Sequence, residues 1–154
     1  MTTIVVDFET ANRAGVDLRE VGAEVYSQHP LTEILCLCLL ADYGYGWTWR
    51  PGQPLEDIPL LARDPSVIFE AHGAFFEQMI WRNIMVPRYG LPEIPIERWS
   101  CTMAAALYRG LPGQLEKLAD VLELPERKDM EGSKLTIALS KPMTKAEHMK
   151  RWPG

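Results

Sequence analysis

With 154 residues, of which 47% are hydrophobic, the chain has enough apolar side chains for one domain with a single core and is too short for a second. Its net charge of −5 argues against a protein that holds nucleic acid by electrostatic attraction alone. No basic and apolar leader opens the sequence, and the longest apolar run, residues 34–41, is too short to cross a bilayer. We therefore expect a soluble, cytoplasmic protein with no membrane partner.

An apolar, β-branched stretch from Ile4 to Thr10 opens the chain and predicts a strand buried in a sheet. Alternate side chains of a strand share a face, so Asp7 and Glu9 lie on the same face, about 6–7 Å apart along the backbone. Two neighbouring buried carboxylates repel each other unless a cation lies between them. The pair therefore suits a divalent metal ion, and the alternative is a strand that ends in a solvated acidic turn.

The next residues predict a mixed series of strands and helices. Alternating small and apolar residues at 21–26 indicate a strand, and the apolar run 33–41 indicates a strand buried on both faces. Residues 43–49 suggest a turn and a short edge strand. We further expect a helix within 55–63 with Ile58, Leu61 and Ala62 inside, a strand at 66–71, and a helix over 73–86.

The second half of the chain predicts helices at 100–108, 115–122 and 133–140. Ser100 or Thr102 would cap the first of them, and Gly110 would follow its end. The spacing of Thr144 and Glu147 is that of a capping box, so a further helix should start there. Because few residues remain after it, we expect a single domain, residues 1–154, that is incomplete before its final helix.

Charge and cysteine placement add two expectations. Lys and Arg outnumber Asp and Glu in residues 126–154, and a basic end beside an acidic body suits a phosphodiester substrate, although a solvated helix face explains the same residues. The three cysteines lack the spacing of a zinc site, and we expect core thiols at Cys36, Cys38 and Cys101.

Three blocks of sequence carry a resemblance to a known family. They are Asp7-Phe8-Glu9-Thr10, then Ala71-His72-Gly73-Ala74-Phe75-Phe76-Glu77, then Cys101-Thr102-Met103-Ala104 with Gly110-Leu111-Pro112 and Lys128-Asp129-Met130-Glu131-Gly132. In this order the chain resembles the 3′–5′ exonuclease domain of phage-type family A DNA polymerases, among the DnaQ-like (DEDD) exonucleases of the ribonuclease H-like fold. The resemblance covers nearly the whole chain.

The resemblance implies an α/β fold, a mixed sheet flanked by helices, with a carboxylate cluster that binds two Mg²⁺ or Mn²⁺ ions. Asp7 would bridge both ions, Glu9 would serve the ion that activates water, and Glu77 would serve the other. Such ions steady the incoming and leaving oxygens of an in-line displacement. Thr10 would touch the terminal nucleotide through its backbone, with His72 and Phe76 as further substrate contacts. The implied partners are the single-stranded 3′ end of DNA and a polymerase remainder or subunit.

The chain also departs from the family pattern. The family usually has Asn at the place of Gly73 and commonly Asp at that of Glu77. Its third motif supplies a last metal-binding Asp with a Tyr four residues before it or a His five before it, and neither spacing follows Glu77. Asp129 belongs to a separate block, and His72 and His148 are poor candidates for a general base. A non-cleaving module that binds nucleic acid or a polymerase partner, and a nuclease that acts on RNA, therefore remain as alternatives.

Overall fold

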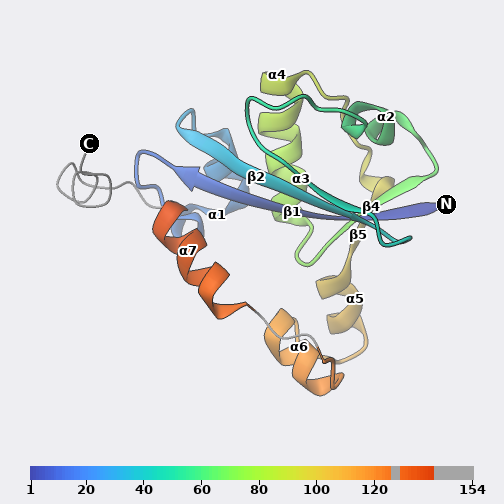
Figure 1. The fold of residues 1–154 in the computed structure, drawn as a ribbon. Helices are drawn as coiled ribbons and strands as arrows, with labels where there is room; N and C mark the ends of the chain where they lie inside the picture. The colour runs from blue at the N-terminus through green and yellow to red at the C-terminus, as the bar shows by residue number, and fades with distance from the viewer. Residues whose placement is uncertain (126–128, 141–154) are drawn as a thin grey trace.

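A five-stranded mixed sheet forms the centre of the computed structural model, which describes residues 1–125 and 129–140 (Figure 1). The strand order is β3-β2-β1-β4-β5, with β2 antiparallel to both of its neighbours and β4 parallel to both of its own. The strands are β1 (Thr2–Asn12), β2 (Thr32–Ala41), β3 (Gly46–Trp49), β4 (Val67–Ala71) and β5 (Trp99–Cys101). The predicted fold class, a mixed sheet flanked by helices, is confirmed.

Helices lie on both sides of this sheet, with α3 and α4 on one side and α5, α6 and α7 on the other (Figure 1). A single helical rod is formed by α3, the π-helical η1 and α4, as predicted for residues 73–86. The helical elements are α1 (Leu18–Gln28), α2 (Ile58–Arg63), α3 (Phe75–Ile80), η1 (Trp81–Met85), α4 (Val86–Tyr89), η2 (Ile96–Arg98), α5 (Thr102–Tyr108), α6 (Leu115–Val121) and α7 (Met130–Ser140).

The core lies between one face of the sheet and the rod. From β1 it takes Ile4, Val6 and Phe8, and from the rod Trp81, whose ring contacts Phe8 and Phe69. The other face of β1 carries Val5 and Asp7, which are exposed, and the half-buried Glu9. The predicted division of β1 into an apolar face and an acidic face is therefore confirmed.

Strand β2 is placed as predicted, but the expectation that both of its faces are buried is wrong. Leu37 and Leu39 are buried, whereas Glu33 is exposed and Leu40 keeps 49% of its surface exposed. The reason is that β2 shares the open acidic face of β1, where Asp7 and Glu9 lie opposite Cys38 and Cys36. The ladder shifts register between Glu9 and Thr10, which leaves Leu35 as the extra residue of a bulge.

The strand predicted at residues 21–26 is wrong, because these residues belong to α1. Asp17 caps this helix by accepting a hydrogen bond from the backbone N–H of Arg19 (2.8 Å). Val21 and Val25 are both exposed, so their alternate spacing does not mark the buried face of a strand. Gly22, at φ +78°, marks a kink between two short helical pieces.

The helix predicted at 100–108 begins two residues later, because Trp99–Cys101 pair with β4 as strand β5. The N-cap of α5 is neither Ser100 nor Thr102, as predicted, but Cys101, whose thiol accepts a hydrogen bond from the backbone N–H of Ala104. Gly110, at φ +72°, follows the end of α5 as predicted. The cysteines are free but half-buried, so the expectation of core thiols is wrong.

The remaining predicted elements are present with small shifts. The edge strand is β3, the helix within 55–63 is α2, and the last two described helices are α6 and α7. In the described part of the chain no helix is long and apolar enough to cross a membrane. The capping box at 144–147, His148 and most of the basic segment lie outside the described residues.

Candidate functional site

The acidic pair extends past the end of its neighbouring strand. Pairing of β1 with β4 runs from Thr2 opposite Val67 to Val5 opposite Glu70, and β4 ends at Ala71. Asp7 and Glu9 therefore lie beyond the carboxyl end of β4, next to the turn that leads into α3. Ligands of open α/β sheets bind outside the carboxyl ends of the strands, so this is the expected place for a site.

Glu77 reaches this place from the first turn of α3. The chain turns sharply at Gly73, whose φ of +88° favours glycine although the nearest atom to an added Cβ, Met103 Cε, is 3.9 Å away. The Glu77 side chain is buried, and its Oε2 atom has no hydrogen-bond partner.

Electrostatics connects the three acids through Asp7. Burial raises the pKa of Glu77 to about 7; its own backbone N–H opposes this rise, and the charge of Asp7 adds to it. Burial likewise raises the pKa of Glu9, and repulsion from Asp7 raises it further. The pKa of Asp7 is raised by loss of solvent around its carboxyl group, although part of the residue is exposed. Asp7 is therefore near enough to each of the two glutamates to repel it.

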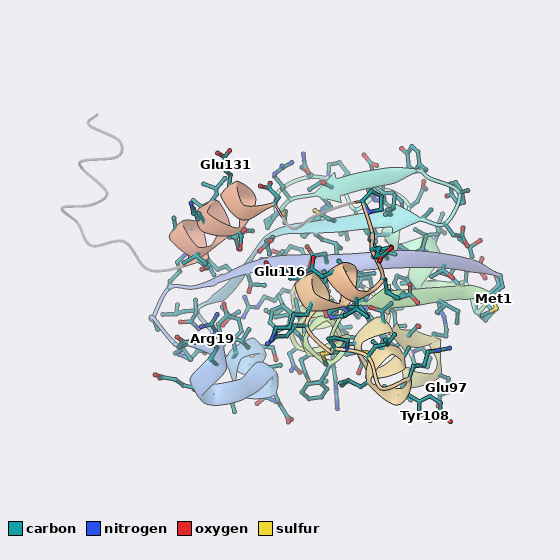
Figure 2. All side chains as sticks on the ribbon, turned by 90° about the horizontal axis from the view of Figure 1, so that it is seen from below. Met1, Arg19, Glu97, Tyr108, Glu116 and Glu131 are labelled. Carbon is teal, nitrogen blue, oxygen red and sulfur yellow. The ribbon has the colours of Figure 1, made fainter. Side chains whose placement is uncertain are left out.

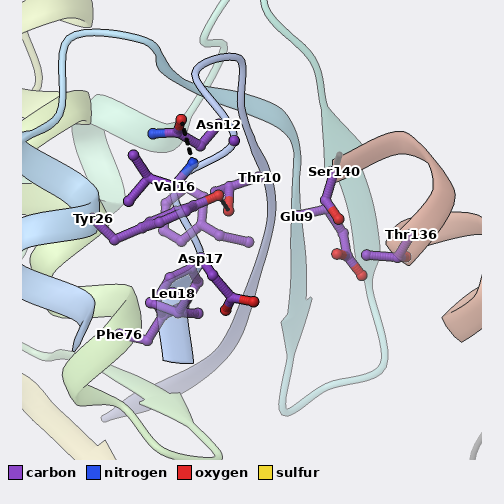
Figure 3. Close-up of a pocket in the computed structure, with 12 residues that line it drawn as sticks. Glu9, Thr10, Asn12, Val16, Asp17, Leu18, Tyr26, Phe76, Thr136 and Ser140 are labelled. Carbon is purple, nitrogen blue, oxygen red and sulfur yellow. Dashed lines mark hydrogen bonds between the residues drawn. The ribbon is translucent and has the colours of Figure 1, made fainter. Parts of the chain in front are cut away.

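A cavity of about 480 Å³ has Glu9, but neither Asp7 nor Glu77, in its wall (Figure 3). One side is largely apolar and aromatic and is formed by β1, the loop before α1, α1 itself and α3; the other consists of Glu9 and hydroxyl groups of α7. The lining residues are Phe8, Glu9, Thr10, Asn12, Gly15, Val16, Asp17, Leu18, Tyr26, Phe76, Thr136 and Ser140. The cavity therefore presents aromatic rings on one side and a carboxylate with hydroxyl groups on the other.

Hydrogen bonds fix the aromatic side of the cavity. The Asn12 Oδ1 atom accepts from the backbone N–H of Ala14 (2.9 Å) and Val16 (3.2 Å), which folds the loop before α1. The Asn12 amide donates to Thr32 Oγ1, and that hydroxyl donates to the Tyr26 carbonyl. The Tyr26 hydroxyl lies 3.1 Å from Thr10 Oγ1, so the wall is tied directly to β1.

The predicted substrate contacts fall in different places. Thr10 and Phe76 line the cavity, where the Phe76 ring lies 6.3 Å from that of Tyr26. His72 does not line it. Its ring nitrogens instead lie 3.0 Å from Thr102 Oγ1 and 2.8 Å from the Gly113 carbonyl, and these contacts join the turn after β4 to α5 and the loop beyond it.

The acids fit a hard divalent cation in their chemistry, but they do not form a closed cage. Carboxylate oxygens are the ligands that Mg²⁺ and Mn²⁺ prefer, and the unpartnered Glu77 Oε2 is a buried acceptor beside the charge of Asp7. Within residues 1–125 and 129–140, however, no three His, Cys, Asp or Glu side chains are grouped closely enough to hold a metal ion.

Several lining residues were not predicted from the sequence. Asp17 followed by Glu20 has the spacing of a helix N-terminus and would have revealed α1, and with it Tyr26 as an inward-facing residue. Thr136 and Ser140 are one turn apart on α7, but nothing in their spacing says which strand that helix covers.

The fold defines an α/β protein of the ribonuclease H-like fold, in which Asp7 and Glu9 lie where the central strand continues past the end of its parallel neighbour. The chain is similar to the DNA polymerase of Bacillus phage SP02, with 32% identity over 151 residues. That match covers 92% of this chain and 21% of the phage protein, so the chain spans about a fifth of the length of this curated relative.

The fold is shared with a solved structure described as the apo form of a nuclease. The two have a TM-score of 0.53 and 18% sequence identity, and the match covers 87% of this chain and 58% of the other. At that identity the likeness concerns the fold. No protein-family model matches the chain.

Proposed function

We propose that this chain is a metal-dependent 3′–5′ exonuclease domain of a phage-type DNA polymerase, a proofreading module that hydrolyses the terminal phosphodiester of DNA. The observation that carries the proposal is the buried Glu77 carboxyl, whose Oε2 atom has no hydrogen-bond partner and whose pKa is raised further by the charge of Asp7 on the central strand. The similarity to a phage DNA polymerase and the fold shared with a nuclease support it. Such a domain would act in the cytoplasm of the host cell.

The metal site would use Asp7, Glu9 and Glu77 as ligands for Mg²⁺ or Mn²⁺. Divalent ions supply charge stabilisation for the attacking and leaving oxygens of phosphodiester hydrolysis. The ligand chemistry and the orphaned Oε2 atom support this assignment, and a cation would relieve the repulsion between the carboxylates.

The protein's own contribution is to hold the 3′-terminal nucleotide. The Phe76 and Tyr26 rings present a surface against which a base can stack, a contact that tolerates any sequence. Beyond Val5, β1 has left its ladder with β4, so its edge can offer backbone groups to a strand end near Thr10. The unpaired end of single-stranded DNA suits a cavity that is open to solvent on one side.

Incubation of the protein with 3′-labelled single-stranded DNA and Mn²⁺ tests the proposal. We expect release of the terminal nucleotide that stops on addition of a chelator and in Asp7→Ala. Asp57→Asn is the matched control, because Asp57 is exposed and makes no capping hydrogen bond. Cleavage that survives Asp7→Ala would refute the assignment of the site.

A second candidate is a module of the same fold that binds nucleic acid or a polymerase partner without cleaving. The absence of a three-ligand group among the described residues favours it. Calorimetry with Mn²⁺ separates the two. One weak ion, with DNA bound and intact, supports the binding module, whereas two tight ions and released nucleotides support the exonuclease.

A further inference from the structure

The half-buried ring of His72 joins three segments that are far apart in the sequence. Strands β4 and β5 are parallel and end level with each other, so His72 and Thr102, the residues that follow them, leave the sheet side by side. The His72 Nδ1 atom lies 3.0 Å from the Thr102 hydroxyl oxygen. The Nε2 atom lies 2.8 Å from the Gly113 carbonyl, which can only accept, so Nε2 donates. The ring therefore connects the turn before α3 with the start of α5 and the loop before α6.

The loop before α6 packs closely against α5. A Cβ atom added at Gly113 would lie 3.1 Å from Leu107 Cδ2, so a residue without a side chain allows this close approach. Figure 2 views the molecule from the side on which these helices lie, with Tyr108 on α5 and Glu116 on α6. The loop thus offers His72 a carbonyl partner that its packing on α5 holds in place.

The start of α3 lacks a side-chain cap. Its N-cap residue, Ala74, makes no side-chain capping hydrogen bond, and Gly73 before it stands at φ +88°, in a region that glycine enters freely. Further along the rod, Ile80 is buried in the core, whereas Phe76, in the first turn, is only half-buried and lines the cavity. The hydrogen bonds of the His72 ring therefore supply the side-chain anchor that Ala74 does not.

We propose that His72 is a positioning residue, which fixes the start of α3 and thereby holds the Phe76 ring in the wall of the cavity. The inference rests on the proposed function, in which that ring stacks on the terminal base. His72 serves the nucleotide without touching it, since it does not itself line the cavity. This role differs from the direct substrate contact expected from the sequence.

Calorimetric titration with deoxythymidine monophosphate tests the proposal. His72→Leu removes both ring nitrogens, whereas the amide of His72→Gln can still donate and accept. We expect the affinity to fall about 5- to 50-fold in the first variant, within the range for a lost base-stacking contact, and to return to within about threefold of the parent in the second. Thr102→Val removes one partner of the ring and should lower the affinity about two- to threefold, a result that stands even if His72→Leu does not fold.

The double variant His72→Leu/Phe76→Leu separates positioning from a general loss of stability. If His72 acts through the Phe76 ring, His72→Leu should cost little further affinity in the Phe76→Leu background. Arg98→Lys is the control, because it disturbs buried hydrogen bonds away from the cavity and should leave the affinity unchanged. Thermal melts accompany each titration, so that only folded variants are compared.

Two results would overturn the positioning role while the proposed function stands. In the first, folded His72→Leu binds the nucleotide like the parent; in the second, it loses affinity equally in both backgrounds. If the parent itself neither binds deoxythymidine monophosphate nor releases nucleotides from DNA, the proposed function fails, and the inference fails with it.

Discussion

The replacement Glu77→Gln should make the stability of the protein much less dependent on pH. The pKa of Glu77 rises from its ordinary 4.5 to about 7 in the folded protein. The unfolded chain therefore loses this proton at lower pH than the folded one, so the free energy of unfolding falls as pH rises from about 4.5 to about 7 and then levels off. A buried glutamine carries no charge at any of these pH values.

The difference between the two pKa values corresponds to about 3 kcal/mol, at 1.36 kcal/mol per pH unit. Between pH 5 and pH 8 the parent should lose roughly 2–3 kcal/mol more stability than Glu77→Gln. For a chain of this size that is a difference of roughly 5–10 °C in the shift of melting temperature.

Thermal and urea unfolding followed by circular dichroism, in the presence of EDTA, measures this difference. The matched control is Glu116→Gln, because Glu116 also lies in the first turn of its helix but is exposed. It should change stability by the same small amount at both pH values. If the parent and Glu77→Gln lose equal stability between pH 5 and pH 8, then the carboxyl group of Glu77 is not buried with a raised pKa in the folded protein.

Three further outcomes follow from the structure. Mn²⁺ added at pH 8 should raise the melting temperature of the parent more than that of Glu77→Gln, because a ligand stabilises the state that binds it. Phe76→Leu should weaken the binding of a deoxynucleoside monophosphate by about 1–3 kcal/mol in calorimetry, since it removes a stacking ring but retains packing volume. Arg98→Lys should cost about 2–4 kcal/mol in urea unfolding without changing the affinity for Mn²⁺, because the Arg98 guanidinium donates to the carbonyls of Leu61, Ala62 and Val67.

Much of the sheet was predictable because β1 and β4 combine β-branched residues with clear turn signals. The faces of β1 were also predictable, since the period of a strand is two and the core residues Ile4, Val6 and Phe8 alternate with Asp7 and Glu9. Strand β5 was not, because three residues that run into a helix carry no periodicity of their own. Helix α1 was assigned to the wrong class because exposed valines happened to alternate.

The candidate site likewise has one part that the sequence predicts and one part that only the folded structure reveals. Asp7 and Glu9 are neighbours by strand geometry alone, and the parallel pairing of β1 with β4 explains why Glu77, in the first turn of α3, lies near Asp7. The opposite wall of the cavity depends on tertiary packing, as Glu9 and Thr136 line it together although they are far apart in the chain. The hydrogen-bond partners of His72 could not be predicted from the sequence either, since its ring contacts residues 30 and 41 positions away.

The two-residue period of β1 fixes at once which face of the strand carries the acids and which face carries the core residues. An insertion of one residue between Val6 and Asp7 would carry both carboxylates to the side occupied by Phe8 and Trp81, and would bring apolar groups to the open side. Evolution can therefore exchange residues along this strand far more freely than it can change the strand's length ahead of Asp7.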